Sequence, residues 1–372
     1  MQSKISIVKC TDYQPEVVFE ALKKSLALLG GIANFVRPAS SVLVKPNLLM
    51  AKEPQFGITT HPQIVRSVIK LLKEINCEIY VGDGPSVWGG QAENIDEVYE
   101  RTGIREVCHQ EDVKLIKFDK SRWRGKFSLT CWLDTCDYLV NVPKFKTHEL
   151  TTLTGAIKNL FGLVYSAHKT QLHKDYFQIE DFARILVDIY KQTRPALTII
   201  DAVSSMEGDG PATSGKLRNL GLLLAGADCL ALDSCLAIIM GLSPLEIPTN
   251  KAAAAQGLGI SDINSINILG ARLEDIKQEA FQLPATSIKR HLPKPVIELA
   301  KKLIKYYPCV ERDNCTRCAI CIASCPNKAI SLKKKSIVFD YSKCIYCFCC
   351  QETCPKAAIK VRKSIAAKII GL

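Results

Sequence analysis

One cysteine pattern occurs twice near the end of this 372-residue chain. In each copy, gaps of two residues separate three cysteines, and a fourth follows four positions later, directly before a proline. The first copy comprises Cys315, Cys318, Cys321 and Cys325, and the second comprises Cys344, Cys347, Cys350 and Cys354. Equivalent residues are 29 positions apart, which indicates an internal duplication.

This spacing resembles the ligand run of bacterial two-cluster ferredoxins, in which the fourth cysteine of each run binds the other cluster. The resemblance implies two [4Fe-4S] clusters with crossed ligands. Cluster one would be held by Cys315, Cys318, Cys321 and Cys354, and cluster two by Cys344, Cys347, Cys350 and Cys325. A zinc ribbon is disfavoured because it needs two C-x2-C knuckles. We expect the nearby Cys309 and Cys349 to be packed thiols rather than ligands.

The other cysteines indicate a reducing compartment. Of seventeen cysteines, eight belong to the repeated pattern, and the rest are scattered through apolar stretches rather than forming a disulfide framework. The first nine residues alternate apolar and polar side chains, so no export signal is predicted. The longest apolar stretch, Leu220 to Leu242, contains Asp228 and Asp233, so no transmembrane segment is predicted. We therefore expect a cytoplasmic protein.

The positive charge is concentrated at the cysteine end. The chain carries a net charge of +12, and residues 287–372 contain 18 Lys and Arg against 5 Asp and Glu. Part of this charge would offset the anionic clusters, and the rest could attract an acidic redox partner protein. No stacking platform or helix-turn-helix accompanies the charge, so no nucleic-acid binding is expected.

The hydrophobic pattern before the cysteines predicts the fold class. Short apolar runs alternate with helical periods, which is typical of an α/β main domain with a largely parallel sheet, here followed by a small C-terminal α+β two-cluster ferredoxin-like domain. We predict an α/β domain over 1–286, a basic helical linker over 287–308 and the cluster domain over 309–372. Within the linker, Pro295 to Tyr306 has one apolar stripe that would dock the two parts, with membrane-surface binding as an alternative.

Ionisable and polar side chains follow several predicted strands. Because the carboxyl ends of parallel strands form the ligand-binding edge of such sheets, we expect these residues to line one cleft. Binding of a small anionic substrate is assigned to Lys45, Asn47, Asp83, Asn159, Asp201 and Asp209. Catalytic anion stabilisation and proton transfer are assigned to His61, Lys144, Lys146, His148, Lys158 and His173.

Two other readings of these residues concern metals and nucleotides. The histidines could hold an additional metal ion, although His148, His168 and His173 lack a recognisable ligand spacing. The segment Gly210 to Lys216 matches the first part of a P-loop. However, Leu217 stands where Ser or Thr must bind Mg²⁺, and the following residues are expected to be extended, which argues against nucleotide hydrolysis.

The order of these motifs resembles the domain-of-unknown-function 362 proteins that carry a C-terminal pair of four-iron clusters. The matching stretches include Val44 to Leu48, Thr59 to Pro62, Val81 to Pro85, Asn141 to His148, Thr154 to Gly162, Asp201-Ala202, Met206 to Pro211 and Ala231 to Asp233. They run in order over most of the chain. The resemblance implies an enzymatic or redox domain fused to a ferredoxin.

The sequence leaves two functions open. The leading hypothesis is an iron–sulfur oxidoreductase of anaerobic type that exchanges electrons between two [4Fe-4S] clusters and a small anion in the lysine- and histidine-lined cleft. The alternative is a non-catalytic electron carrier or cofactor-maturation accessory protein. Cationic residues that converge in one concave pocket would favour the enzyme, whereas residues dispersed over a convex face would favour the carrier.

Overall fold

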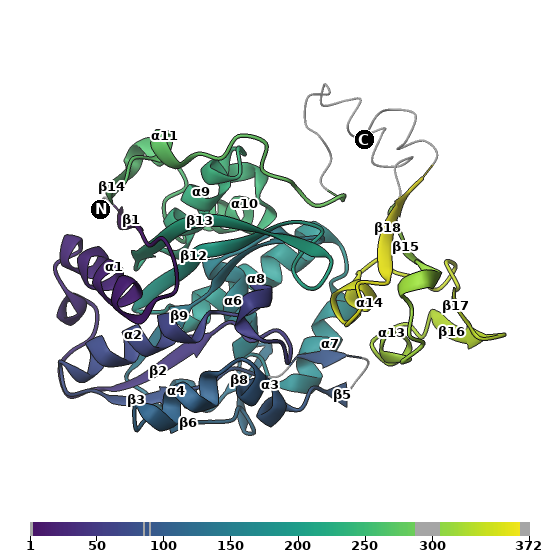
Figure 1. The fold of residues 1–372 in the computed structure, drawn as a ribbon, viewed down its shortest axis with the longest axis horizontal. Coiled ribbons are helices and arrows are strands. Elements are labelled where there is room, and N and C mark those ends of the chain that lie inside the picture. The colour runs from purple at the N-terminus through teal and green to yellow at the C-terminus, as the bar shows by residue number, and fades with distance from the viewer. Residues whose placement is uncertain (1–2, 85, 89–90, 287–305, 365–372) are drawn as a thin grey trace.

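The computed structural model describes residues 3–84, 86–88, 91–286 and 306–364. It contains a large α/β part and a smaller cysteine-rich part at the C-terminal end (Figure 1). The predicted helix from Pro295 lies outside the described residues, except Tyr306, which begins a strand.

The main sheet is mixed and mostly parallel, as the sequence predicts. Its order is β14-β1-β13-β12-β9-β2-β3-β6, and only the β1–β13 and β12–β13 neighbours along this path are antiparallel. Its strands are β1 (Ser3–Lys9), β2 (Ser41–Pro46), β3 (Glu78–Val81), β6 (Lys114–Leu115), β9 (Tyr138–Val142), β12 (Leu197–Gly208), β13 (Gly215–Gly226) and β14 (Ile266–Gly270). Two further strands, β10 (Lys144–His148) and β11 (Thr152–Thr154), join the sheet because β10 pairs with β12 and β11 pairs with β10.

Helices cover both faces of this sheet (Figure 1). The helices of the main part are α1 (Pro15–Leu28), α2 (Pro62–Lys73), α3 (Ile95–Arg101), α4 (Ile104–Gln110), α5 (Trp132–Thr135), α6 (Ala156–Asn159), α7 (Ser166–Asp175), α8 (Ile179–Thr193), α9 (Cys229–Ile239), α10 (Pro248–Ala255) and α11 (Leu273–Ile276). Two small hairpins, β4–β5 (Val87–Trp88, Gln91–Ala92) and β7–β8 (Ser121–Arg124, Phe127–Thr130), lie outside the main sheet.

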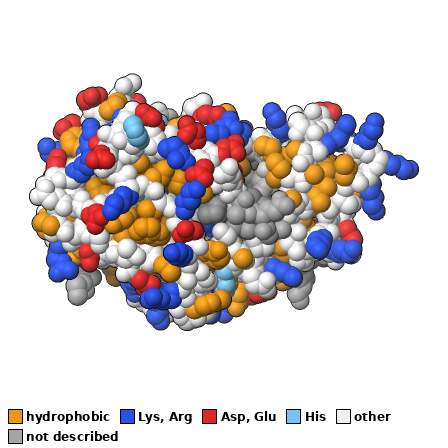
Figure 2. All heavy atoms as spheres, turned by 90° about the horizontal axis from the view of Figure 1, so that it is seen from below, with side chains coloured by type: hydrophobic (Ala, Val, Ile, Leu, Met, Phe, Trp, Pro, Cys, Tyr) orange, Lys and Arg blue, Asp and Glu red, His pale blue; other side chains and the backbone are white. Residues whose placement is uncertain are grey.

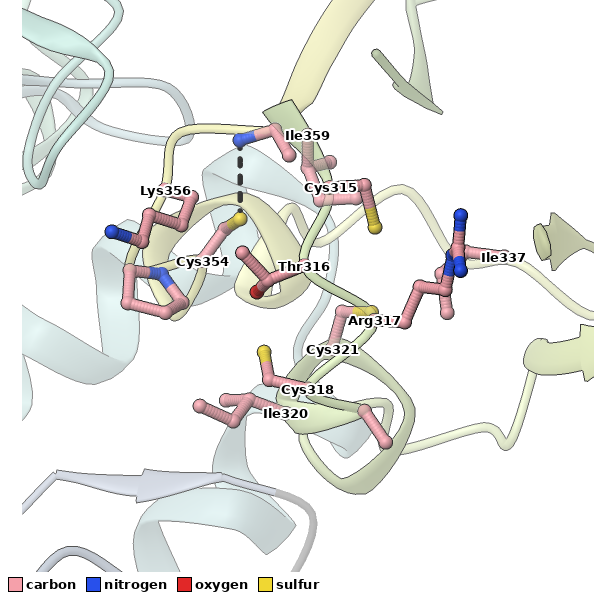
Figure 3. Close-up of a pocket in the computed structure, with 13 residues that line it drawn as sticks. Cys315, Thr316, Arg317, Cys318, Ile320, Cys321, Ile337, Cys354, Lys356 and Ile359 are labelled. Atoms are coloured by element: carbon pink, nitrogen blue, oxygen red, sulfur yellow. Dashed lines mark hydrogen bonds between the residues drawn. The ribbon is translucent and has the colours of Figure 1, made fainter. Parts of the chain in front are cut away.

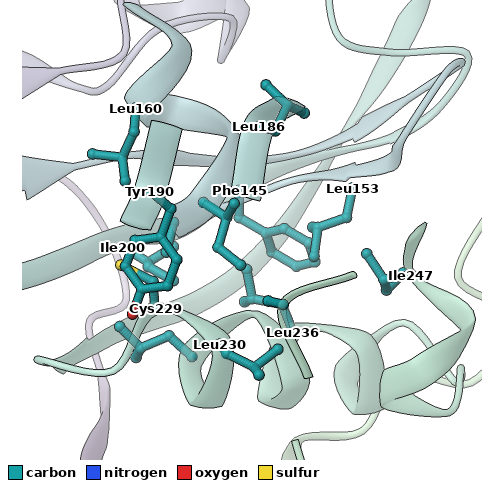
Figure 4. Packing of buried hydrophobic residues seen from close by; sticks show 14 of the residues in the cluster. Phe145, Leu153, Leu160, Leu186, Tyr190, Ile200, Cys229, Leu230, Leu236 and Ile247 are labelled. Atoms are coloured by element: carbon teal, nitrogen blue, oxygen red, sulfur yellow. The ribbon is translucent and has the colours of Figure 1, made fainter. Parts of the chain in front are cut away.

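The main sheet separates two hydrophobic cores, one on each face. On β2, Leu43 belongs to one core, whereas Val42 and Val44 belong to the other, because successive strand side chains point to opposite faces. Figure 4 shows part of the first core, to which Leu230 and Leu236 of α9 and Ile200 of β12 all belong. Burial on both faces explains why the strands are continuous apolar runs in the sequence.

The long β12–β13 hairpin extends the sheet past the end of β9. After Pro143 the chain enters β10, where Lys144 pairs with Asp201 and Lys146 with Met206 of β12. The P-loop-like segment enters β13 at Gly215 rather than a helix, as expected from the sequence. This extension carries several predicted site residues beyond the carboxyl edge of the parallel strands.

The cysteine-rich part repeats its backbone as well as its sequence. It contains β15 (Tyr306–Val310) paired with β18 (Ile359–Lys363), the hairpin β16–β17 (Ile330–Lys333, Ser336–Phe339), α13 (Ile320–Ala323) and α14 (Cys349–Glu352). Non-glycine residues with positive φ recur 29 positions apart, as Arg317 (59°) and Tyr346 (56°), Ala319 (62°) and Phe348 (58°), and Lys328 (51°) and Ala357 (49°). Such a conformation is uncommon for these residues, so its recurrence supports the duplication.

Candidate functional site

A pocket of about 610 Å³ opens between the main part and α14 of the cysteine-rich part. Its wall combines residues that follow β2 and β3 with residues of α6, α7 and α14. The polar residues that line it are Lys45, Asn47, Asp83, Ser86, Thr154, Lys158, Asn159, Lys169, His173 and Glu352. Six of the predicted cleft residues therefore face one concave space, and they are Lys45, Asn47, Asp83, Lys158, Asn159 and His173.

A buried ion pair forms the floor of the pocket. Lys45 Nζ lies 2.8 Å from Asp83 Oδ1, and both side chains are almost fully buried. The backbone N–H groups of Leu48 and Gly84 donate to the same carboxylate at 2.9 and 2.8 Å. Gly162 lies so close that a Cβ there would overlap both Asp83 Oδ1 and Lys45 Nζ. The two backbone N–H groups and the close approach of Gly162 therefore hold the ion pair in place.

Asparagines connect this pair to a second buried lysine. Asn47 Nδ2 donates to Asn159 Oδ1 at 3.0 Å, while Asn47 Oδ1 accepts from Lys146 Nζ at 2.9 Å. Lys146 also donates to the Ile58 carbonyl at 2.6 Å, and Asn159 donates to Asn141 at 2.8 Å. Burial and the nearby Lys158 lower the pKa of Lys146 well below its ordinary value. Lys146 thus lies behind the pocket and holds its wall.

The pocket also contains polar groups that form no hydrogen bond with the described residues. Thr154 Oγ1 and His173 Nδ1 are buried and make no hydrogen bond. Lys158 forms no hydrogen bond or ion pair with the described residues, and burial lowers its pKa. Because an unsatisfied buried polar group is costly, the two buried atoms beside the half-buried Lys158 point to a ligand.

The pocket also contains a lysine and a histidine whose pKa values are displaced by burial. Burial lowers the pKa of Lys169 to about 8, with Asp83 opposing the shift. Burial likewise lowers the pKa of His173 to about 4, so its ring is neutral near pH 7. Proton transfer is most effective for a group whose pKa lies near the working pH, which suits Lys169.

The cysteine-rich part contributes Glu352 to the pocket. Its Oε1 lies 3.2 Å from Nε2 of His148, and both residues are buried. The backbone N–H groups of Leu150 and Thr151 donate to Nδ1 of His148, so the neutral ring carries its proton on Nε2, toward Glu352. Burial raises the pKa of Glu352, but His148, Lys158 and His173 outweigh it and lower the pKa to about 2.

Three predicted residues form a separate group outside the pocket lining. Lys144 Nζ lies 2.9 Å from Asp201 Oδ2, and the Tyr13 hydroxyl donates to the other carboxylate oxygen at 2.8 Å. His61 stacks on Tyr13 with ring centroids 3.7 Å apart, and its Nδ1 accepts from the backbone N–H of Gln63 at the start of α2. These contacts make His61 the N-cap residue of α2 and place it outside the pocket in which it was expected to transfer protons.

The last predicted binding residue, Asp209, lies at the contact with the cysteine-rich part. Its Oδ1 accepts from the backbone N–H of Ala285 at 2.9 Å. Gln351 of α14 donates to the Asp209 carbonyl at 3.5 Å and to Glu149 Oε1 at 3.4 Å. Asp209 does not line the pocket of Lys45 and Glu352.

The eight cysteines of the two runs surround two cavities. A cavity of about 340 Å³ is lined by Cys315, Cys318, Cys321 and Cys354, and one of about 320 Å³ by Cys325, Cys344, Cys347 and Cys350. Figure 3 shows the first cavity, where the sulfur atoms come from separate parts of the chain. These are the crossed sets expected for two clusters.

The surroundings of the sulfur atoms fit a cubane. The backbone N–H groups of Ala329 and Ala358, which are equivalent in the repeat, donate to Cys325 Sγ and Cys354 Sγ, both at 3.1 Å. Hydrogen bonds of this kind stabilise cluster thiolates. Within the described ranges, no three His, Cys, Asp or Glu side chains lie close enough together to hold a single metal ion. Each set instead lines a cavity that can take one cluster.

Several residues of the pocket escaped the sequence-based assignment. Glu352 was overlooked inside the cysteine run, although it is a lone acid in a basic segment. Thr154 begins one of the family-like stretches but, like Lys169, has no role predicted from the sequence. None of the helices in the described part of the chain is long and apolar enough to span a membrane.

A mostly parallel α/β domain joined to a domain with two four-cysteine cavities defines an iron–sulfur protein with a ferredoxin-type domain. The model of the family named Domain of unknown function (DUF362) matches residues 42–237, and that of the 4Fe-4S dicluster domain matches residues 314–358. The chain belongs to the DUF362 family, which confirms the resemblance drawn from its motifs.

Two known proteins are similar to the chain to different degrees. The "Thylakoid-associated protein sll1697" of Synechocystis is 32% identical over 265 residues, which cover 69% of this chain and 81% of that protein. The lactate racemase apoprotein of Thermoanaerobacterium thermosaccharolyticum matches in structure with a TM-score of 0.35 and 14% identity, over 61% of this chain and 54% of that one. The latter likeness is too low to carry an argument.

Proposed function

We propose that the chain is an iron–sulfur oxidoreductase that acts on a small anion bound in the pocket between its two parts. Bound clusters would supply one-electron transfer, and their number, two, follows from the two cysteine sets. The observation that carries the proposal is Glu352, which lines the anion pocket two residues after the cluster ligand Cys350. Substrate and cluster would therefore lie on opposite sides of one short helix.

The polarity of the pocket supports an anionic substrate. Lys45, Lys158 and Lys169 outnumber the two carboxylates of Asp83 and Glu352. Lys45 is already paired with Asp83, so Lys158 is the cation best placed to hold a carboxylate or phosphate group. Thr154 would donate its hydroxyl proton to the same ligand.

Acid–base groups at the pocket suit a substrate that changes protonation as it gains or loses electrons. Lys169 would donate a proton because its pKa lies near neutrality, and the neutral His173 would accept one at Nδ1. His148 would hold Glu352 in place rather than react. We include a cytoplasmic, anaerobic setting in the proposal because the thiols must remain reduced.

Anion binding by the anaerobically reconstituted protein tests the proposal, with acetate and inorganic phosphate as probes in isothermal titration. We expect at least one probe to bind, and Lys158→Met to raise its Kd at least about tenfold, since one buried charge contact contributes about 1.5–3 kcal/mol. Lys174→Met is the matched control, because Lys174 is exposed on the same helix as Lys169. The enzyme assignment fails if neither probe binds, or if both variants behave alike.

The carrier or accessory role remains the second candidate. Convergence of the lysines in one concave pocket favours the enzyme, as does the pocket's position beside a cluster ligand. A protein that binds neither probe but keeps its iron would instead support the carrier.

A further inference from the structure

The two halves of the cysteine-rich part differ in exposure although they share one ancestry. Residues 316–320 are exposed, whereas their equivalents 345–349 are half-buried or buried. Cys318 is exposed, while the equivalent Cys347 is buried. The first cavity therefore has an edge open to solvent.

Packing against the main part explains this difference. In α14, Glu352 contacts His148 and Gln351 contacts Glu149, and the Thr213 hydroxyl donates to the Cys354 carbonyl at 2.6 Å. The equivalent α13 and the β16–β17 hairpin lie on the side away from the main part (Figure 1). The first cavity therefore touches the main part at Cys354 and is open to solvent at residues 316–320, whereas the equivalent residues around the second cavity are covered.

The outward face is basic with scattered apolar residues. Residues 306–364 contain 11 Lys and Arg against 4 Asp and Glu. Lys333, Lys334 and Lys335 are exposed at the turn of the β16–β17 hairpin. Figure 2 shows Lys and Arg side chains around this end of the molecule. Two large apolar side chains of this half are also exposed, Ile320, which lines the first cavity, and Leu332, which precedes Lys333.

We propose that this outward face, centred on Cys318 and the hairpin lysines, docks a small acidic electron-carrier protein. Charge complementarity identifies the partner, because a basic rim around an accessible redox centre attracts an acidic protein and orients it. The apolar residues are isolated, which suits a small, transient contact of the electron-transfer type. In each encounter the carrier loses one electron and a cluster gains it, or the reverse, and no bond or proton is exchanged.

The proposal rests on the cluster assignment within the proposed function, but not on the anion pocket. Absence of iron from the reconstituted protein would overturn both. Failure of acetate and phosphate to bind would overturn only the pocket assignment, because docking at Cys318 does not involve it.

Stopped-flow reduction by a chemically reduced acidic [2Fe-2S] ferredoxin tests the docking face. The variant combines Lys333→Glu, Lys334→Asp and Lys335→Asp, because Asp tolerates the positive φ of Lys334 (46°) and Lys335 (62°). We expect its second-order rate constant to fall at least about tenfold at low salt, and the wild-type rate to fall as salt rises. Reduction by dithionite and iron content should stay unchanged.

The matched control reverses three exposed charges at the opposite end, Lys9→Glu, Lys23→Glu and Lys24→Glu. It should react with the ferredoxin at nearly the wild-type rate. A neutral variant, Lys333→Gln with Lys334→Asn and Lys335→Asn, should give an intermediate rate if charge is the cause. Equal rates for the hairpin and control variants would overturn the proposal. So would a hairpin variant that loses binding to phosphatidylglycerol vesicles while keeping the wild-type ferredoxin rate, since the face would then bind membranes.

Discussion

Glu352 Oε1 lies 3.2 Å from His148 Nε2 and thereby joins the ferredoxin-type domain to the wall of the pocket. The two residues come from different parts of the chain, and both are buried. The contact places a carboxylate beside Lys158, where it competes with any anionic ligand for the positive charge. It therefore affects both domain packing and ligand affinity.

Glu352→Gln should tighten anion binding while it loosens the domain contact. Removal of one negative charge from the pocket should lower the Kd for phosphate or acetate about tenfold, or about 1.4 kcal/mol. The lost contact to His148 should cost about 1–3 kcal/mol and speed amide hydrogen exchange in α14. Glu311→Gln, at an exposed position of the same domain, is the control and should change neither quantity. Weaker binding in Glu352→Gln would contradict this account.

Gly162→Ala should disrupt the floor of the pocket. A methyl group there would overlap the Lys45–Asp83 ion pair, so one partner must move. We expect a loss of about 1–3 kcal/mol in the free energy of unfolding, together with weaker anion binding in calorimetry. Gly257→Ala is a useful contrast, because its φ of 64° is strained but no atom lies within 4 Å of the added Cβ. That variant should lose stability without losing affinity, and equal affinities in both would argue against a role for Gly162.

The features best predicted from the sequence are those that depend on the spacing of residues close together in the chain. Cysteine ligands of a cluster must recur at fixed intervals, so both cavities could be assigned from the sequence. Lys45 lies near the carboxyl end of β2 and Asp83 just after the adjacent parallel strand β3, so their convergence was also predictable. Lys144 and Asp201 are paired between β10 and β12, yet both also contact Tyr13, which is 188 residues before Asp201 in sequence. No local pattern shows that such a distant hydroxyl satisfies them.

The contribution of Glu352 could not be predicted for a related reason. Its place in the pocket depends on how the ferredoxin-type domain packs against the main domain, and this is a property of tertiary structure. The same packing separates the two halves of a repeat that are nearly symmetric in sequence. Only the structure distinguishes the inward half from the outward one.

His61 should make the stability of the main domain depend on pH below neutrality. Burial lowers the pKa of His61 to about 4 in the folded protein, whereas an unfolded histidine has a pKa near 6.5. Between these two pKa values the unfolded state therefore binds more protons than the folded state. The buried, neutral His61 contributes stability that is complete above pH 6.5 and is lost as the pH falls toward 4. Between pH 7.5 and 5.5 the loss should be roughly 1 kcal/mol.

His61→Asn isolates this effect because Asn also caps helices but does not titrate. Urea unfolding followed by tryptophan fluorescence is the measurement, since all three tryptophans precede residue 133 and so report the main domain. The wild type should lose about 1 kcal/mol more than the variant between the two pH values. Identical pH dependence in both proteins would show that His61 does not titrate in this way. His109→Asn, at an exposed site in α4, is the control and should behave as the wild type.

The crossed ligand sets predict which pairs of cysteine substitutions are redundant. Cys354→Ser and Cys315→Ser both remove ligands from the first cavity, although they lie in different copies of the repeat. The double variant should therefore lose only one cluster and keep about half of its iron, like each single variant. Cys354→Ser with Cys344→Ser damages both cavities and should lose nearly all iron. Iron analysis and electron paramagnetic resonance after anaerobic reconstitution are the measurements. If each copy bound its own cluster, the two double variants would exchange their results, because Cys354 and Cys344 would then share one site.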